Sequence, residues 1–276
     1  MTDKLANATY IAPIFASLLF GVLCTFLVIN AQMETYPVTP FPEDAYGFLG
    51  SLGNGLYFIV LVGGGATFLY IFIKRKNQKM IKLLTGFAVT TAIFALSMFY
   101  LIALFSNVNM PYPDLTVIAL ALLMTAAGDY VLFRNVRNLS FIIVLALGGA
   151  LGAFLGAMIP TASAVLILAL LAVYDTFAVY RGPVGKIARS GLEQLRGLSF
   201  SFKDVQMGLG DLTFYSMLSG VMLINFGFYS CLASIAGILA GCLLSFKMLE
   251  KKGIFPGLPF PVLLGLLLGF IASLAH

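Results

Sequence analysis

The chain has 276 residues, of which 61% are hydrophobic and only 10% are charged, and its mean hydropathy is +1.02. A soluble domain carries about a quarter charged residues, so this composition excludes a water-soluble protein and predicts one polytopic membrane domain over residues 1–276. The net charge of +5 does not indicate a nucleic-acid partner, because the basic residues stand in short clusters between apolar runs, the pattern that orients membrane proteins.

Nine apolar runs are long enough to cross a bilayer, which takes about 20 residues at ~1.5 Å each. Six runs fall within residues 10–180, a cytoplasmic connection follows at 181–206, and three runs fill residues 207–275. The predicted spans are 10–30, 48–73, 84–105, 115–133, 139–159, 161–180, 207–227, 229–246 and 257–275. Two divisions depend on single residues: Pro160 interrupts one long uncharged stretch, and Gly227 supplies a turn in another.

All 16 lysines and arginines fall on one side of this nine-span arrangement. They precede the first span or lie in the connections after spans 2, 4, 6 and 8. The opposite connections contain only acidic charges, which are Glu34, Glu43, Asp44 and Asp114. Because cytoplasmic loops are rich in Lys and Arg, the N-terminus is predicted to be cytoplasmic and the C-terminus outside. A miscounted span would scatter these charges over both faces, which favours nine.

Three aspartates, Asp129, Asp175 and Asp211, lie within predicted spans. A charged aspartate at a helix centre costs about 2.5–3.5 kcal/mol, so each should line a cavity, find a partner or serve the function. Asp175 and Asp211 lie about 9–12 Å from the cytoplasmic charges on neighbouring antiparallel spans, so they can face each other. A buried polar contact that pins two helices together is the alternative. We expect Asp129 to reach the interface or to pair with Arg134.

Two unusual backbone segments lie at the depth of the aspartate pair. Gly208 and Gly210 bracket Leu209 directly before Asp211, where glycine permits close approach and non-helical backbone. Such backbone is tolerated in a membrane where protein covers it or where it lines a wet cavity. The last span opens with Pro256, Gly257, Leu258 and Pro259. Spacing alone slightly favours an ordinary span boundary over an extended segment that seats a substrate.

Together, "VYD" at 173–175, "GLGD" at 208–211 with "FYS" at 214–216, and "PGLP" at 256–259 resemble the presenilin and signal peptide peptidase family of GxGD intramembrane aspartyl proteases. Gly257 departs from the family's alanine, from which we expect added flexibility. The connection 181–206 is short where eukaryotic presenilins carry a long cleaved loop, so self-cleavage is not expected. The predicted orientation and the compact chain look like a prokaryotic, archaeal or bacterial, presenilin homologue in the cell membrane.

The resemblance implies an all-α, presenilin-like fold and an endopeptidase that cuts within or near transmembrane segments of membrane proteins. It assigns Asp175 and Asp211 as the catalytic pair, which would share a proton and activate water. It assigns site-shaping or substrate-binding roles to Tyr174, Gly208, Leu209, Gly210, Pro256, Gly257, Leu258 and Pro259. No cofactor or metal is expected, nothing in the sequence requires accessory subunits, and a homo-oligomer stays open.

Extended substrate would need new backbone partners, which strand addition could supply near 256–259 or after Gly182 and Pro183. Residues 184–198 form an amphipathic pattern that fits an interfacial helix over the entrance or a solvated connecting helix. Gly148, Gly152 and Gly156 permit close helix packing or dimerisation. Cys24, Cys231 and Cys242 are expected to be packing residues rather than a disulfide or metal set.

The main alternative function is a proton-coupled transporter or channel that uses the same aspartates. Transporters often consist of repeated halves, whereas spans 1–4 contain no second copy of the motifs. Other protease chemistries are poorly supported, because the only histidine is the terminal His276 and no H-E-x-x-H motif occurs.

Overall fold

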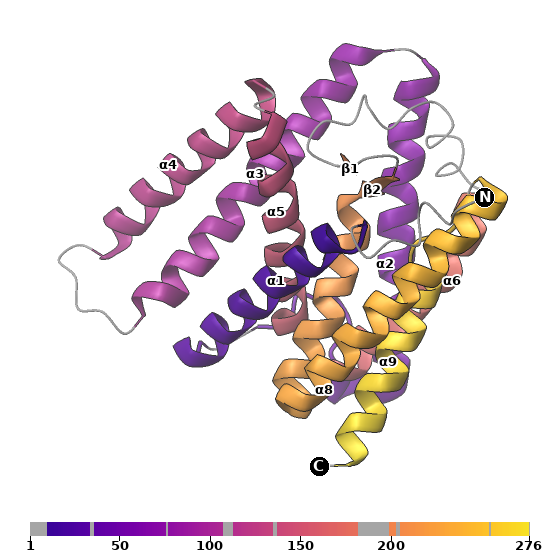
Figure 1. Cartoon of the computed structure of the whole chain (residues 1–276). Coiled ribbons are helices and arrows are strands. Elements are labelled where there is room, and N and C mark those ends of the chain that lie inside the picture. The colour runs from indigo at the N-terminus through magenta and orange to yellow at the C-terminus, as the bar shows by residue number, and fades with distance from the viewer. Residues whose placement is uncertain are drawn as a thin grey trace.

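The computed structural model describes residues 10–33, 36–75, 77–106, 113–134, 137–181, 199–202, 205–253 and 255–275. Its elements are α1 (Ala12–Ala31), α2 (Glu43–Lys74), α3 (Gln78–Phe105), α4 (Pro113–Arg134), α5 (Arg137–Met158), α6 (Thr161–Tyr180), β1 (Ser199–Phe202), β2 (Val205–Gly208), α8 (Leu209–Lys252) and α9 (Pro259–Leu274) (Figure 1). The segment 184–198, for which an amphipathic helix was expected, lies outside the described residues.

Seven of the described helices are long and apolar enough to cross a membrane, and α9 is a shorter apolar helix. This is the architecture of a multi-pass integral membrane protein. Every predicted span falls on a helix, and the predicted spans 207–227 and 229–246 both fall on α8. Helix α2 begins at Glu43 rather than at residue 48, because the helical segment continues across a kink at Gly47.

The two predicted breaks are confirmed. Helix α5 ends at Met158, and Pro160 stands at the N-cap of α6. Gly227 has φ 86° and ψ 178°, a left-handed backbone conformation that favours glycine and divides the 44-residue α8 into two helical halves. Helix α9 packs against both halves, because a Cβ on Gly265 would lie 2.7 Å from Leu218 and 2.8 Å from Ile238.

The small-residue strings serve contacts inside the chain. A Cβ would lie 2.7 Å from Leu212 at Gly148, 2.5 Å from Ser216 at Gly152 and 3.0 Å from the Met217 carbonyl at Gly156, all on the first half of α8. The string in α5 therefore lets two helix backbones approach closely within one subunit, which favours internal packing over dimerisation.

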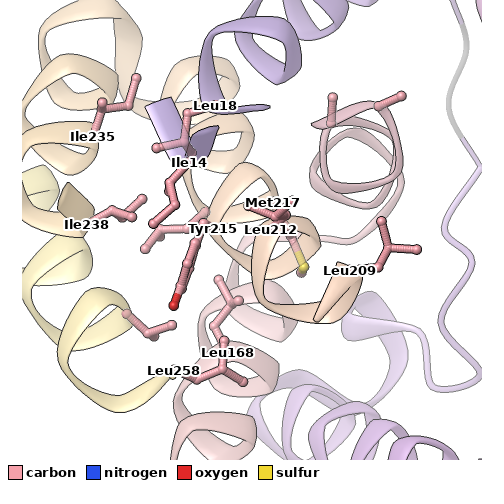
Figure 2. Packing of buried hydrophobic residues seen from close by; sticks show 14 of the residues in the cluster. Ile14, Leu18, Leu168, Leu209, Leu212, Tyr215, Met217, Ile235, Ile238 and Leu258 are labelled. Atoms are coloured by element: carbon pink, nitrogen blue, oxygen red, sulfur yellow. The ribbon is translucent and has the colours of Figure 1, made fainter. Parts of the chain in front are cut away.

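The core is centred on α8. In Figure 2, Tyr215 lies among Ile14 and Leu18 of α1, Ile238 of α8 and Leu258. The three cysteines are free and buried, as predicted for small packing residues.

A short antiparallel sheet of two four-residue strands precedes α8, and it was not predicted within the otherwise all-α fold. Ser199 pairs with Gly208 and Phe202 with Val205, so β2 ends directly before Leu209. The predicted span start at residue 207 is therefore two residues early, and the described end of the 181–206 connection is a strand. The four-residue segments were too short to stand out beside apolar runs of about 20 residues.

Candidate active site

The carboxylate of Asp175 is held by the backbone before α9. Its Oδ2 accepts a hydrogen bond of 3.0 Å from the Leu258 N–H, and the Gly257 amide also interacts with this carboxylate. These amides precede the first turn of α9, so no helical carbonyl uses them. Carboxylates are stabilised at helix N-termini. The segment opened by Pro256 therefore binds one predicted catalytic side chain.

Asp211 lies in the first turn of α8, where the Gly208 amide interacts with it. Gly208 has φ −79° and ψ 148°, so the chain passes from strand to helix just before this aspartate. A Cβ at Gly257 would lie 3.1 Å from Asp211 Oδ2 and 3.2 Å from Oδ1. Glycine at this position leaves room for the carboxylate.

The two aspartates thus meet at one dipeptide, Gly257–Leu258. Asp175 takes the Leu258 amide, Asp211 lies against the Gly257 Cα, and the two carboxylates interact electrostatically. Both side chains are partly buried. The structure therefore brings together two acidic side chains from different helices, α6 and α8. Among the described contacts, no basic side chain lies between them.

Phe255 and Phe260 flank the segment that contains the Gly257–Leu258 dipeptide, and their rings contact each other. They stack at a centroid distance of 5.5 Å with an interplanar angle of 10°. Pro256 and Leu258, which lie between these two residues in the sequence, are buried, and α9 begins at Pro259. The segment is therefore a packed, non-helical turn rather than an ordinary start of a long helix.

The other predicted site residues take different positions. The Tyr174 hydroxyl points toward α2, where a Cβ on Gly63 would lie 2.8 Å from it. Leu209 is buried against Gly148 of α5, so its side chain supports the core. Gly208 and Gly210 have open space, with their nearest neighbours at 3.9 Å or more.

Sequence reasoning gave no role to Tyr215. Its hydroxyl donates a hydrogen bond of 2.9 Å to the Gly257 carbonyl, and its side chain is only 1% exposed. Cys242, on the second half of α8, forms a hydrogen bond with the same hydroxyl. Tyr215 stands four residues after Asp211, the spacing that places two side chains on one helix face, so this signal could have identified it.

Asp129 does not lie at this site and does not follow its expected pairing. Its Oδ2 accepts a hydrogen bond of 2.8 Å from Thr90 of α3, and its buried Oδ1 has no hydrogen-bond partner among the described residues. The Arg134 guanidinium lies over the Tyr130 ring, 5.0 Å from its centroid. Asp129 therefore ties α4 to α3.

Among the described residues, no group of three or more His, Cys, Asp and Glu side chains could hold a metal ion. The described groups at this site include the two carboxylates, the Gly257 and Leu258 amides and the Tyr215 hydroxyl.

No family model and no curated protein matches the chain. Solved structures do match, and two of them are of a presenilin family intramembrane aspartate protease. The structure in space group C222 has a TM-score of 0.70 and 17% identity, covering 96% of this chain and 99% of that chain. The structure in space group P2 has a TM-score of 0.67 and 18% identity, covering 98% of each. At this identity the likeness establishes the fold, which is presenilin-like along nearly the whole chain.

Proposed function

We propose that the chain is an intramembrane aspartyl endopeptidase that hydrolyses peptide bonds within or near transmembrane segments of membrane proteins. The observation that carries the proposal is the meeting of Asp175 and Asp211 at the Gly257–Leu258 dipeptide, inside a bundle of membrane-type helices. The fold shared with presenilin family proteases supports the same reading.

In this proposal the two aspartates act as one unit. Two negative charges held close together cannot both ionise easily, so in this proposal the pair holds one shared proton. The ionised carboxylate removes a proton from water as the water attacks, and the protonated carboxyl polarises the scissile carbonyl. The backbone amides of Gly257 and Leu258 hold Asp175, while Gly208 and Gly210 leave space beside Asp211.

The sheet offers a way to hold an unwound substrate. Strand β2 ends at Gly208, three residues before Asp211, and the described sheet contains only β1 and β2. An extended peptide could add as a third strand, satisfying its backbone groups while its scissile bond reaches the aspartates. Tyr174 and the 256–259 segment would shape the walls around it.

We also propose that the whole chain forms one domain of nine crossings, with α8 contributing two crossings on either side of Gly227 and α9 the last. The placement of all 16 lysines and arginines on one predicted side supports a cytoplasmic N-terminus and an external C-terminus. By resemblance, the membrane would be a prokaryotic cell membrane, and the chain would need no accessory subunit.

A reconstituted cleavage assay tests the proposal. The purified protein is placed in phospholipid vesicles with a fluorogenic transmembrane peptide, and wild type is compared with Asp175→Asn and Asp211→Asn. Each isosteric change should lower cleavage by at least about 10³-fold, because neither carboxylate can replace the other's role.

Asp129→Asn is the matched control, because it removes a membrane aspartate that lies away from the pair; it should retain cleavage. Solute flux that depends on Asp175 and Asp211, in the absence of any peptide cleavage, would instead support a transporter and overturn the proposal.

A further inference from the structure

A cavity of about 640 Å³ lies between α1, α3, α4 and α5, away from the aspartate pair. Helices α3 and α4 form a hairpin on one flank of the bundle (Figure 1). The cavity occupies the space between this hairpin and the central helices. Nothing in the proposed proteolysis uses it.

The cavity wall offers almost no polar group. Among the described residues that line it, none is charged, and the polar side chains are Cys24, Ser97 and Tyr100. The Tyr100 hydroxyl already donates a hydrogen bond of 2.6 Å to the Ala150 carbonyl, and Cys24 bonds to Tyr100. Water needs two to four polar partners to occupy a cavity, and a headgroup needs charged or polar ligands. An occupant of this cavity must therefore be hydrocarbon.

The cavity opens toward the membrane. At its mouth, Leu23 is 58% exposed, Leu104 52% and Met124 49%. At its floor, Leu96 is 6% exposed, Leu147 5% and Ala150 7%. Because these helices are membrane spans, the medium at the mouth is the lipid bilayer, not water.

The cavity has the depth of one leaflet. Along α3 it reaches from Ile93 to Leu104, which is about 16 Å at the helical rise. The hydrocarbon core of a bilayer is about 30 Å thick, so half of it is a matching length. A void of this size left empty would lose the dispersion contacts of its whole lining.

We propose that this cavity is a binding site for one acyl chain of a bilayer lipid, which enters between α1, α3 and α4 and contacts the floor on α5. The chain is recognised by shape and apolar contact, while the headgroup stays outside in the interface. This inference does not rest on the proposed protease activity.

Photolabelling in the bilayer tests the site. The full-length protein is reconstituted in phosphatidylcholine vesicles that contain a phosphatidylcholine with a diazirine on one acyl chain, irradiated, digested and analysed by mass spectrometry. Labels are expected on the floor residues Leu96, Leu147 and Ala150, which lipid outside the bundle cannot reach. Labels confined to exposed residues such as Leu263 and Leu267 of α9 would overturn the proposal.

Cavity-filling variants sharpen the result. Ala146→Phe fills the cavity from α5 and Ala127→Phe from α4, so each should lose most of the floor labelling while α9 labelling is unchanged. Ala126→Phe is the matched control, because Ala126 is exposed on the same helix and does not line the cavity; it should label like wild type.

Because the two filling variants act from opposite walls, one remains informative if the other fails to fold. Unchanged floor labelling in a folded filling variant would overturn the acyl-chain site. Crosslinks through a cysteine at Met124 that join two copies, with an unlabelled floor, would assign the cavity to a second copy and would also overturn it.

Discussion

A carboxylate accepts a backbone amide hydrogen bond at each end of α6, but the two contacts have different surroundings. At its start, Glu43 of α2 accepts hydrogen bonds from the Ser163 amide at 2.5 Å and from the Ser51 hydroxyl at 2.9 Å. Near its other end, Asp175 accepts from the Leu258 amide at the start of α9. In each case a carboxylate binds a free amide at a helix N-terminus.

The two carboxylates differ in their neighbouring polar groups. Glu43 is joined by the buried Asn54, whose amide group donates to the Phe41 carbonyl and the Ser163 hydroxyl, both at 2.8 Å. Asp175 is joined instead by a second carboxylate, Asp211. The first arrangement satisfies its polar groups within the protein and fixes α2 to α6. The second places two carboxylates together, the arrangement on which the proposed proton exchange depends.

The largest expected effect comes from removing the structural partner. Asn54→Ala should lower the free energy of unfolding by about 1–3 kcal/mol, because it removes the partner of the Phe41 backbone groups and of the buried Ser163 hydroxyl. Thermal unfolding in detergent measures the loss, and cleavage per folded molecule should change little. Asn225→Ala is the matched control, since Asn225 is exposed and bonds only one carbonyl of its own helix. Equal destabilisation by both variants would contradict the difference between the two ends.

A smaller effect is expected from Tyr215→Phe, near the end of α6 that carries Asp175. We expect Tyr215 to be a positioning residue that orients the Gly257–Leu258 peptide toward Asp175. Removing its hydroxyl deletes one hydrogen bond, so kcat should fall about tenfold while KM stays near its wild-type value.

Steady-state cleavage of the fluorogenic peptide separates the two constants, and Tyr57→Phe, on the exposed face of α2, is the control. A lower unfolding temperature with unchanged kcat would reduce Tyr215 to a packing residue.

Gly257→Ala probes the shared dipeptide more gently. The new Cβ would lie 3.1 Å from Asp211 Oδ2, so the carboxylate must move by a few tenths of an ångström. We expect cleavage to fall about threefold, equivalent to ~0.6 kcal/mol. Gly64→Ala is the control, because nothing lies within 4 Å of its Cβ. A rate above wild type would show instead that flexibility at Gly257 limits the reaction.

The smallest effect is expected from Thr90→Val. This change removes the donor to Asp129 on the α3–α4 hairpin, far in the fold from the aspartate pair. The cleavage rate should match wild type in the same vesicle assay. A marked loss would mean that the hairpin communicates with the site, and the comparison of the two ends of α6 would then be incomplete.

Much of the fold could be predicted because membrane spans are local features. The length of an apolar run in the sequence predicts the length of the span, and Pro160 and Gly227 break the helix through their own backbone conformation. The pairing of Asp175 with Asp211 was also accessible, since depth follows from helical rise between neighbouring spans.

Apart from the short β1–β2 sheet, the missed features depend on partners distant in the chain. Asn54 meets Ser163 across 109 positions, and Tyr215 meets Gly257 across 42. Asp129 was expected to pair with the nearby Arg134, but an aromatic ring holds that guanidinium and Thr90 approaches from another helix. Packing in three dimensions decided these contacts. Spacing along one helix can place Tyr215 on the same face as Asp211, but it does not identify the distant partner.

Because the chain reverses direction at Gly227, the lengths of the two halves of α8 determine where Gly257 lies relative to Asp211. The chain climbs from Asp211, turns at that one glycine, and returns through the second half to deliver Gly257 beside the same carboxylate. Each residue added to one arm would lift the returning segment by ~1.5 Å and rotate it by about 100°. The number of residues between Asp211 and Gly257 therefore has to fit the return to the same depth, so an insertion in either half of α8 would move Gly257 away from the Asp211 carboxylate.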